Sequence, residues 1–284
     1  MGSGTKPEVI HEAPSPFGTV FVVDEGDERS LRFDSPHGSR QSVFLKSDPL
    51  AVPLSYVRVA MAGLAFTQGR SRVLVVGLGG GTFPMLLHQL LPRVVVDVVE
   101  INPVVVEIAR RFFSLRGNSR LRIAVEDGAR FLGQEGPHYD LIFLDAFSEH
   151  GTPGHLKEFP FFEAARRRLA PGGVGVLNIA FEEPRGLAER IETFARAFED
   201  CALLRGSSES NNTLGVGTLE PVPPEPLFWQ QLKQLSRELG FPALTRSVVS
   251  FERATRRETS TREGHERAFP LLTGGREDPS SSDP

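Results

Sequence analysis

Four glycines lie within five positions of the stretch VLVVGLGGGTFPMLLHQLL, at Gly77, Gly79, Gly80 and Gly81. A glycine-rich turn lets the backbone approach a ligand closely, and a helix that follows such a turn presents free N–H groups at its N-terminus. The apolar run before the glycines and the helical spacing after them predict a strand, a turn and a helix. This combination is typical of a nucleotide-binding turn, although the cluster by itself does not select the nucleotide.

Three acidic residues fall where the neighbouring strands are predicted to end. Glu100 ends the run VVVDVVE, Asp127 follows the run LRIAVE, and Asp145 ends the run YDLIFLD. The carboxyl ends of parallel strands share one edge of a sheet, so these acids are expected to line the same site as the glycines. An acid before a helix is also a common N-cap, and that interpretation stays open for each acid taken singly.

The acids indicate an adenosine ligand. Glu100 lies about 23 residues beyond Gly77, close to the spacing of an acid that binds both ribose hydroxyls. Asp127 could accept a hydrogen bond from the adenine amino group, with the Gly128 backbone beside it. Thr82 occupies the third glycine position of the dinucleotide motif, which disfavours NAD. A cationic, phosphate-free ligand such as S-adenosylmethionine or a relative suits an acidic rim better.

Strands and helices alternate from residue 72 onward. This order predicts an α/β fold with a doubly wound, mostly parallel seven-stranded sheet, preceded by a small β-rich domain. The predicted organisation is a flexible N-terminus (1–16), a β-rich domain with a linking helix (17–66), a Rossmann-like nucleotide-binding domain (67–220), a helical appendage (221–252) and a disordered tail (253–284).

The stretch 72–181 resembles the spermidine synthase-like branch of the class I S-adenosylmethionine-dependent methyltransferase superfamily. The similarity is carried by VLVVGLGGG, VDVVEINPVVVEIARRFF, RIAVEDGARFL and YDLIFLDAFSEHGTPGHLKEFPFFEAARRRLAPGGVGVLNI, and with the β-rich segment it covers roughly residues 17–217. It implies the class I methyltransferase fold and the following roles: Gly77, Gly79 and Gly81 in the cofactor loop, Glu100 at the ribose, Asp127 and Gly128 at the adenine, Gln41 at the far end of the cofactor, and Asp145 as the base for an amine nucleophile.

Two departures from this family bear on the reaction. Aminopropyltransferases carry an acid at the positions of Gly80 and Ser148, and this chain carries none there. Their loss leaves room for the carboxylate of ordinary S-adenosylmethionine beside Gly80. We therefore expect methyl transfer to an amine or oxygen acceptor, with Asp145 as base or orienting group. Two alternatives stay open: aminopropyl transfer from decarboxylated S-adenosylmethionine, and a non-catalytic adenosine-binding partner subunit.

Four further residues are candidates for contact with the acceptor. Tyr56 lies where the resemblance places substrate contacts, and Phe147, Ser148 and His150 follow Asp145 in a predicted loop. Core packing is the alternative for Tyr56, and loop structure is the alternative for the other three. His150 lacks a partner at metal-ligand spacing, so no metal site is predicted.

Composition limits the possible partners and compartment. The 284 residues carry a net charge of −4 and a single cysteine, Cys201. Without a basic excess, no nucleic-acid partner is expected, and one cysteine fits a reducing compartment. No apolar run approaches the roughly 18 residues of a membrane span, and no signal-peptide pattern opens the chain. We expect a cytoplasmic protein that acts on a small-molecule amine or a peptide, with a homodimer implied only by the resemblance.

Overall fold

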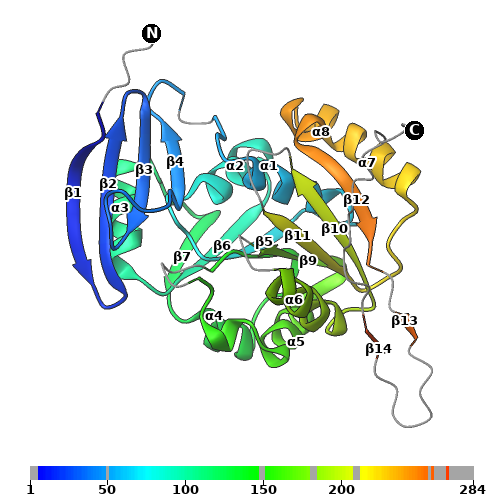
Figure 1. Cartoon of the computed structure of the whole chain (residues 1–284). Coiled ribbons are helices and arrows are strands. Elements are labelled where there is room, and N and C mark those ends of the chain that lie inside the picture. Colours follow the sequence, from blue (N-terminus) through cyan, green and yellow to red (C-terminus); the bar gives the residue numbers. More distant parts are fainter. Residues whose placement is uncertain are drawn as a thin grey trace, which may run out of the picture.

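The computed structural model describes most of the chain, namely residues 6–48, 51–146, 151–179, 184–206 and 212–254, together with the short strands β13 (Arg257–Glu258) and β14 (Arg267–Ala268). In this part of the chain, the strands form a four-stranded sheet, an eight-stranded sheet and the pair β13–β14. The four-stranded sheet stands beside the larger one, whose two faces are covered by helices (Figure 1).

The N-terminal sheet is antiparallel and keeps the chain order of its strands, β1 (Glu8–Ser15), β2 (Gly18–Glu25), β3 (Glu28–Phe33) and β4 (Ser42–Leu45). The prediction of a flexible N-terminus up to residue 16 is therefore wrong. β1 is an edge strand whose side chains are exposed or half-buried, so main-chain pairing with β2 contributes much of its stability. Gly18, at φ +99°, closes the tight turn between the two strands.

The larger sheet has the strand order β12-β10-β11-β9-β8-β5-β6-β7. Its strands are β5 (Arg72–Val76), β6 (Val95–Glu100), β7 (Leu121–Val125), β8 (Tyr139–Leu144), β9 (Leu169–Ile179), β10 (Asp200–Gly206), β11 (Thr213–Thr218) and β12 (Val248–Arg253). The run from β9 to β7 is parallel, whereas β11, β10 and β12 are antiparallel to their neighbours.

The predicted α/β class and the mostly parallel, doubly wound sheet are confirmed, but the sheet has eight strands in place of the predicted seven. The extra strand is β12, which pairs with the edge strand β10. It ends the C-terminal appendage that we expected to be helical from 221 to 252. Most of the predicted tail from residue 253 lies outside the described residues.

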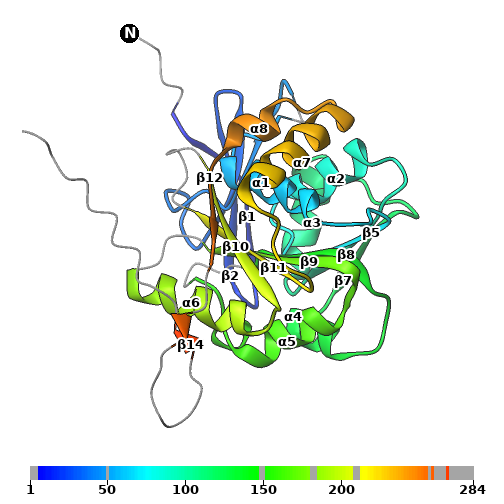
Figure 2. The same ribbon diagram turned by 90° about the vertical axis from the view of Figure 1, so that its right-hand side faces the viewer.

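Helices cover the two faces of the larger sheet in separate groups (Figures 1 and 2). One group comprises α1 (Ser55–Met61), the short helix η1 (Ala62–Ala65), α2 (Thr82–Leu90), α3 (Pro103–Phe112), α7 (Glu225–Glu238) and α8 (Ala243–Ser247). The opposite group comprises α4 (Gly128–Gly133), the short helix η2 (Gly154–Leu156), α5 (Phe159–Arg167) and α6 (Pro184–Arg196).

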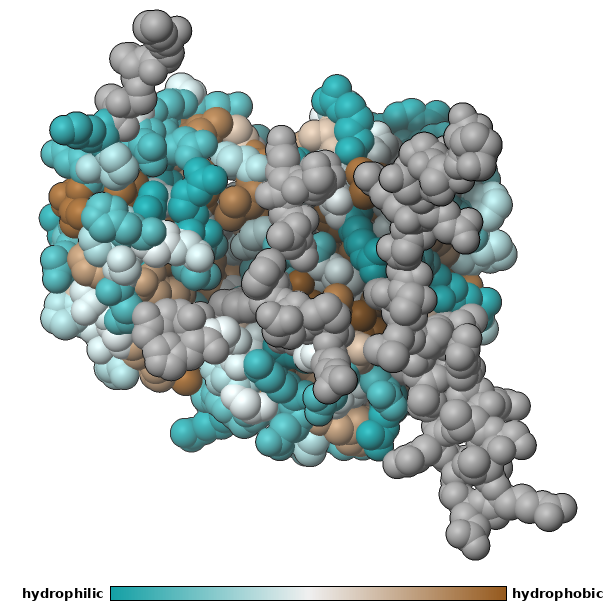
Figure 3. All heavy atoms as spheres, in the orientation of Figure 1, coloured by the Kyte–Doolittle hydropathy of each residue, from teal (hydrophilic) through white to brown (hydrophobic). Residues whose placement is uncertain are grey.

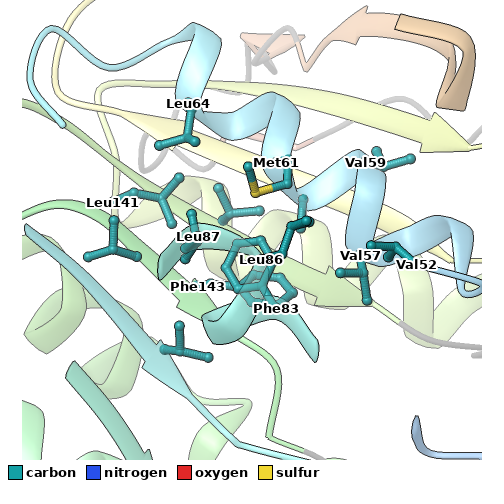
Figure 4. Close-up of a cluster of buried hydrophobic side chains, with 14 of the residues drawn as sticks. Val52, Val57, Val59, Met61, Leu64, Phe83, Leu86, Leu87, Leu141 and Phe143 are labelled. Atoms are coloured by element: carbon teal, nitrogen blue, oxygen red, sulfur yellow. The ribbon is translucent and has the colours of Figure 1, made fainter. Parts of the chain in front are cut away.

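A buried core between α1, α2 and the sheet fixes the start of α2 over β8. Met61 and Leu64 point from α1 and η1 toward Phe83 and Leu87 of α2, above Phe143 of β8 (Figure 4). The rings of Phe83 and Phe143 have their centroids 4.5 Å apart. Burial of each of these side chains contributes about 1.5–3 kcal/mol. This packing holds the glycine turn, which immediately precedes α2, against the end of β8.

β5 lies at the centre of the parallel part of the sheet. The chain moves outward from β5 through β6 to β7, then returns to the other side of β5 to form β8. Such a reversal opens a crevice at the carboxyl ends of the two central strands, where ligands bind in open α/β sheets. The glycine turn follows β5 and Asp145 follows β8, so both lie at this switch point.

On the face shown in Figure 3, apolar residues occur in small separate groups between hydrophilic ones. Among the described helices, none has both the length and the apolar character required of a membrane-spanning segment.

Candidate active site

The turn after β5 and the turn after β8 touch at their backbones. Gly77 has φ +99°, and a Cβ built on it would lie 2.3 Å from the carbonyl oxygen of Asp145. The Asp145 N–H donates to Val76 O at 2.8 Å, and the Gly77 N–H donates to Val99 O at 2.8 Å. Only glycine fits at position 77, so the glycine turn and Asp145 are held together by the fold.

Three glycines of the turn adopt positive φ: Gly77, Gly79 (+54°) and Gly81 (+84°). Gly80 differs, because a Cβ there would lie 2.8 Å from Cδ1 of Phe113 and 2.9 Å from Oγ of Ser42. A side chain at position 80 would therefore meet two neighbouring side chains, and the expected room for a ligand carboxylate beside Gly80 stays a prediction.

Glu100 is buried behind the turn and supports it. Its Oε2 accepts the Leu78 N–H at 2.9 Å, and its Oε1 accepts the Asn102 N–H at 2.9 Å. Burial raises the pKa of Glu100 above its ordinary value, and the backbone N–H groups that bond the carboxylate offset this only partly. Bonds from the backbone of Leu78, Asn102 and Ile101 leave at least one acceptor site of the carboxylate for a ribose hydroxyl, so the predicted ribose contact is compatible with this role and stays a prediction.

Asp127 is the N-cap of α4, which is the alternative interpretation that stayed open for this acid. Its Oδ1 accepts the Arg130 N–H at 2.9 Å, and its Oδ2 lies 2.9 Å from Nε2 of His155. Burial opposes ionisation of Asp127, but the bonds from Arg130 and His155 hold its pKa below the ordinary value. Gly128 packs directly on β5, where a Cβ would lie 2.5 Å from Cγ1 of Val76. An adenine amino group at Asp127 would have to share Oδ2 with His155.

The Tyr56 side chain extends from α1 to Asp145, so this candidate for contact with the acceptor lies at the site. The Tyr56 hydroxyl donates to Oδ2 of Asp145 at 3.4 Å. Burial raises the pKa of Asp145 from 3.8 to about 7, against the opposing effect of its hydrogen bonds with Asn178 and Tyr56. Burial and the Asp145 charge raise the pKa of Tyr56 well above its ordinary value. Asp145 therefore exchanges a proton near neutral pH, as a general base should.

Two asparagines extend this arrangement, and the sequence reasoning missed both. Asn178 Nδ2 donates to Oδ1 of Asp145 at 2.7 Å, and Asn212 Nδ2 donates to Oδ1 of Asn178 at 2.8 Å. Asn178 is 3% exposed and lies within the apolar strand β9. A polar residue inside a buried strand needs a hydrogen-bond partner, and this was the available signal.

The remaining candidates divide into one that is described and three that are not. Gln41 is half-buried and its N–H donates to Leu31 O at 2.9 Å, directly before Ser42, which borders Gly79 and Gly80. The start of β4 thus adjoins the glycine turn, and the role of Gln41 at the ligand stays a prediction. Three candidates lie outside the described residues, namely Phe147, Ser148 and His150.

A small pocket adjoins Asn178 on the α5 side of the sheet. Its wall is mostly apolar and consists of Leu144, Ala146, Thr152, Leu156, Phe161, Leu177 and Asn178. Within the described ranges, no group of three or more His, Cys, Asp or Glu residues is placed to hold a metal ion.

Comparison with known proteins identifies relatives of this chain. Residues 58–198 match the model of the spermine/spermidine synthase domain. A polyamine aminopropyltransferase of Vibrio vulnificus (strain CMCP6) is 31% identical over 236 residues, which cover 81% of this chain and 79% of the relative.

Solved structures give the same result for the fold. A probable spermidine synthase from Corynebacterium glutamicum matches with a TM-score of 0.69 at 21% identity, over 81% of this chain and 87% of that one. Human methyltransferase-like protein 13 in complex with SAH matches with a TM-score of 0.61 at 25% identity, over 66% of this chain and 93% of that one. The resemblance to the spermidine synthase-like branch of the class I methyltransferase fold is confirmed.

The prediction of methyl transfer as the leading activity is wrong. The relatives that match three quarters of the chain or more are polyamine aminopropyltransferases, so the comparisons favour the alternative of aminopropyl transfer. The missing acids at Gly80 and Ser148, on which the preference for methyl transfer rests, do not by themselves exclude that reaction.

Proposed function

Because the chain belongs to the spermine/spermidine synthase family, we propose that it is an aminopropyltransferase acting on decarboxylated S-adenosylmethionine and an amine. The observation that carries the proposal is the contact between the glycine turn and Asp145, whose pKa is raised to about 7. It supports a reaction in which a nucleotide donor in the turn meets an amine that loses its proton to a carboxylate.

The residues around the turn fit the donor. Positive φ at Gly77, Gly79 and Gly81 requires residues without a side chain, so a ligand can approach the backbone of the turn closely. Glu100 has acceptor capacity left for ribose hydroxyls. Asp127 would offer Oδ2 to the adenine amino group, shared with His155.

The proposed reaction is a direct displacement. The lone pair of the acceptor nitrogen attacks the aminopropyl carbon attached to the sulfonium, and the carbon–sulfur bond breaks with its electron pair left on sulfur. The products are an alkylated amine and a neutral thioether nucleoside, and the nitrogen loses one proton. Asp145 accepts that proton, while Tyr56 keeps the carboxylate facing the nitrogen. Proximity of the two substrates supplies much of the rate enhancement.

The acceptor class is the open part of the proposal. No acid occupies position 80 or position 148, so a diamine would meet fewer carboxylates here than the family pattern provides. We therefore propose a small-molecule amine as acceptor, and the test includes diamines of different length and a monoamine.

The decisive experiment incubates the protein with decarboxylated S-adenosylmethionine and each amine, and measures the thioether nucleoside and the alkylated amine by mass spectrometry. We expect both products in equal amounts, with a loss of about 10²–10⁴-fold in the Asp145→Asn variant. Parallel reactions contain S-adenosylmethionine as donor. Methylated amine without any aminopropylated product would overturn the proposal, as would full nucleotide binding without release of the thioether.

A further inference from the structure

The two oxygens of Asp145 have different surroundings. Oδ1 accepts a short bond of 2.7 Å from the Asn178 amide, whereas among the described residues Oδ2 has only the long contact of 3.4 Å with the Tyr56 hydroxyl. An oxygen that is already engaged by a strong donor is a poorer proton acceptor than one that is not. The chemistry of the carboxylate is therefore directed to Oδ2.

Asn212 determines which end of the Asn178 amide faces Asp145. The Asn212 Nδ2 group donates to Oδ1 of Asn178 at 2.8 Å. This bond requires the oxygen of Asn178 to point toward Asn212, so its NH₂ group must point toward Asp145. A reversed amide would place oxygen against carboxylate oxygen and NH₂ against NH₂, losing both bonds.

The sheet brings Asn178 and Asn212 next to each other and to Asp145. Asn178 lies on β9, opposite Leu214 of β11, and Asn212 directly precedes β11. Asp145 follows β8, the other neighbour of β9. The pairing of three strands thus sets the spacing of the three side chains, without a flexible loop between Asn178 and the carboxylate.

We propose that Asn178 and Asn212 are positioning residues that fix the Asp145 carboxylate with Oδ2 directed to the acceptor nitrogen. This inference rests on the proposed function for the identity of the acceptor. Its structural part, the fixing of the carboxylate, does not depend on which amine is used.

The pair also stabilises the ionised form of Asp145, because an NH₂ group bonds a carboxylate better than a carboxylic acid. In the described part of the chain, the titratable group that contacts Asp145 is Tyr56 from α1. β9 contributes the neutral Asn178, and the glycine turn contributes backbone from Gly77. Removal of the Asn178 bond should therefore move the titration of Asp145 to higher pH.

The test compares Asn178→Leu, Asn212→Ala and the control Thr213→Val. Thr213 is buried on β11 beside the pair and lies outside the proposed machinery. The acid limb of the pH profile of kcat should move upward by about one pH unit in Asn178→Leu, and by less in Asn212→Ala. At pH 7, a shift of one pH unit lowers the rate of Asn178→Leu about five-fold, and the rate recovers near pH 9. The nucleotide affinity of the variants and the pH profile of Thr213→Val should stay unchanged.

A second readout separates this inference from the proposed function. Carboxyl ¹³C NMR of aspartate-labelled protein, with the Asp145 signal assigned by its absence in Asp145→Asn, measures its titration without any substrate. Asn178→Leu should raise that midpoint above the value near 7. An unmoved midpoint overturns the inference even if the rate falls, because Asn178 would then act only through packing. Absence of aminopropyl transfer in the wild type, with a shifted midpoint, overturns the proposed function alone.

Discussion

Substitution of Asp145 by Asn should stabilise the folded protein, and this stabilisation should increase with pH. Burial raises the pKa of Asp145 from 3.8 to about 7, so the fold favours the protonated carboxyl. The asparagine retains both neighbours: its oxygen can accept from Asn178, and its NH₂ group can donate to the Tyr56 hydroxyl. The substitution therefore removes the cost of the charge while both contacts of the side chain can still form.

The direction of this pH dependence follows from proton linkage. Below about pH 4, Asp145 is protonated in both states and the substitution has its smallest effect. Between pH 4 and 7, the unfolded chain ionises while the folded protein keeps its proton, so wild-type stability falls. Above pH 7, the difference is constant. The full shift corresponds to about 4 kcal/mol. Because Asp145 is only half-buried, solvent screening reduces the expected loss between pH 5 and 8 to about 2 kcal/mol.

The measurement is thermal unfolding of the wild type and Asp145→Asn at several pH values. The Tm of the variant relative to the wild type should rise by about 5 °C between pH 5 and 8. The exposed Glu199→Gln variant makes the same change of formal charge at the surface, and its Tm difference from the wild type should stay constant. A difference between Asp145→Asn and the wild type that does not vary with pH would refute the reasoning.

Two further substitutions test the surroundings of the site. Gly80→Asp should lower the Tm by several degrees, since overpacking against Phe113 and Ser42 costs about 1–3 kcal/mol. Addition of Ser42→Gly to the same chain should recover part of the loss. An unchanged Tm in Gly80→Asp would show that the space beside Gly80 is open. His155→Ala should leave the Tm within about 1 °C, because its pair with Asp127 is largely exposed. Calorimetry should show thioether nucleoside binding tightened about two- to five-fold in this variant, whereas weaker binding would show that His155 contacts the nucleotide.

Apolar periodicity was enough to predict the central strands, since β5, β6, β8 and β9 are short apolar runs bounded by turns. β1 and β12 could not be predicted in the same way. None of the β1 side chains is fully buried, so no continuous apolar run marks this strand in the sequence. β12 exists because it pairs with β10, about 45 residues earlier in the chain. Stability that comes from main-chain pairing with a distant strand leaves no local pattern in the sequence.

The same physical difference separates the site residues that could be predicted from those that could not. Gly77 and Asp145 were predictable because the topology of a parallel sheet brings the ends of its strands together. The packing at Gly80 was not, because it depends on Ser42 and Phe113, which come from other elements. The link to Asn178 also depends on strand pairing, which brings a residue 33 positions later in the chain within hydrogen-bond distance of Asp145.

The proton state of Asp145 couples the acceptor to the site. An acceptor amine is cationic at neutral pH, and a carboxylate with a pKa of about 7 is ionised in only about half of the molecules there. A cation that binds beside Asp145 favours the ionised form, so binding must expel part of a proton, and acceptor affinity must rise with pH up to about 7. The bond from Asn178 therefore bears on binding as well as on proton transfer, because it sets how much of that charge is present.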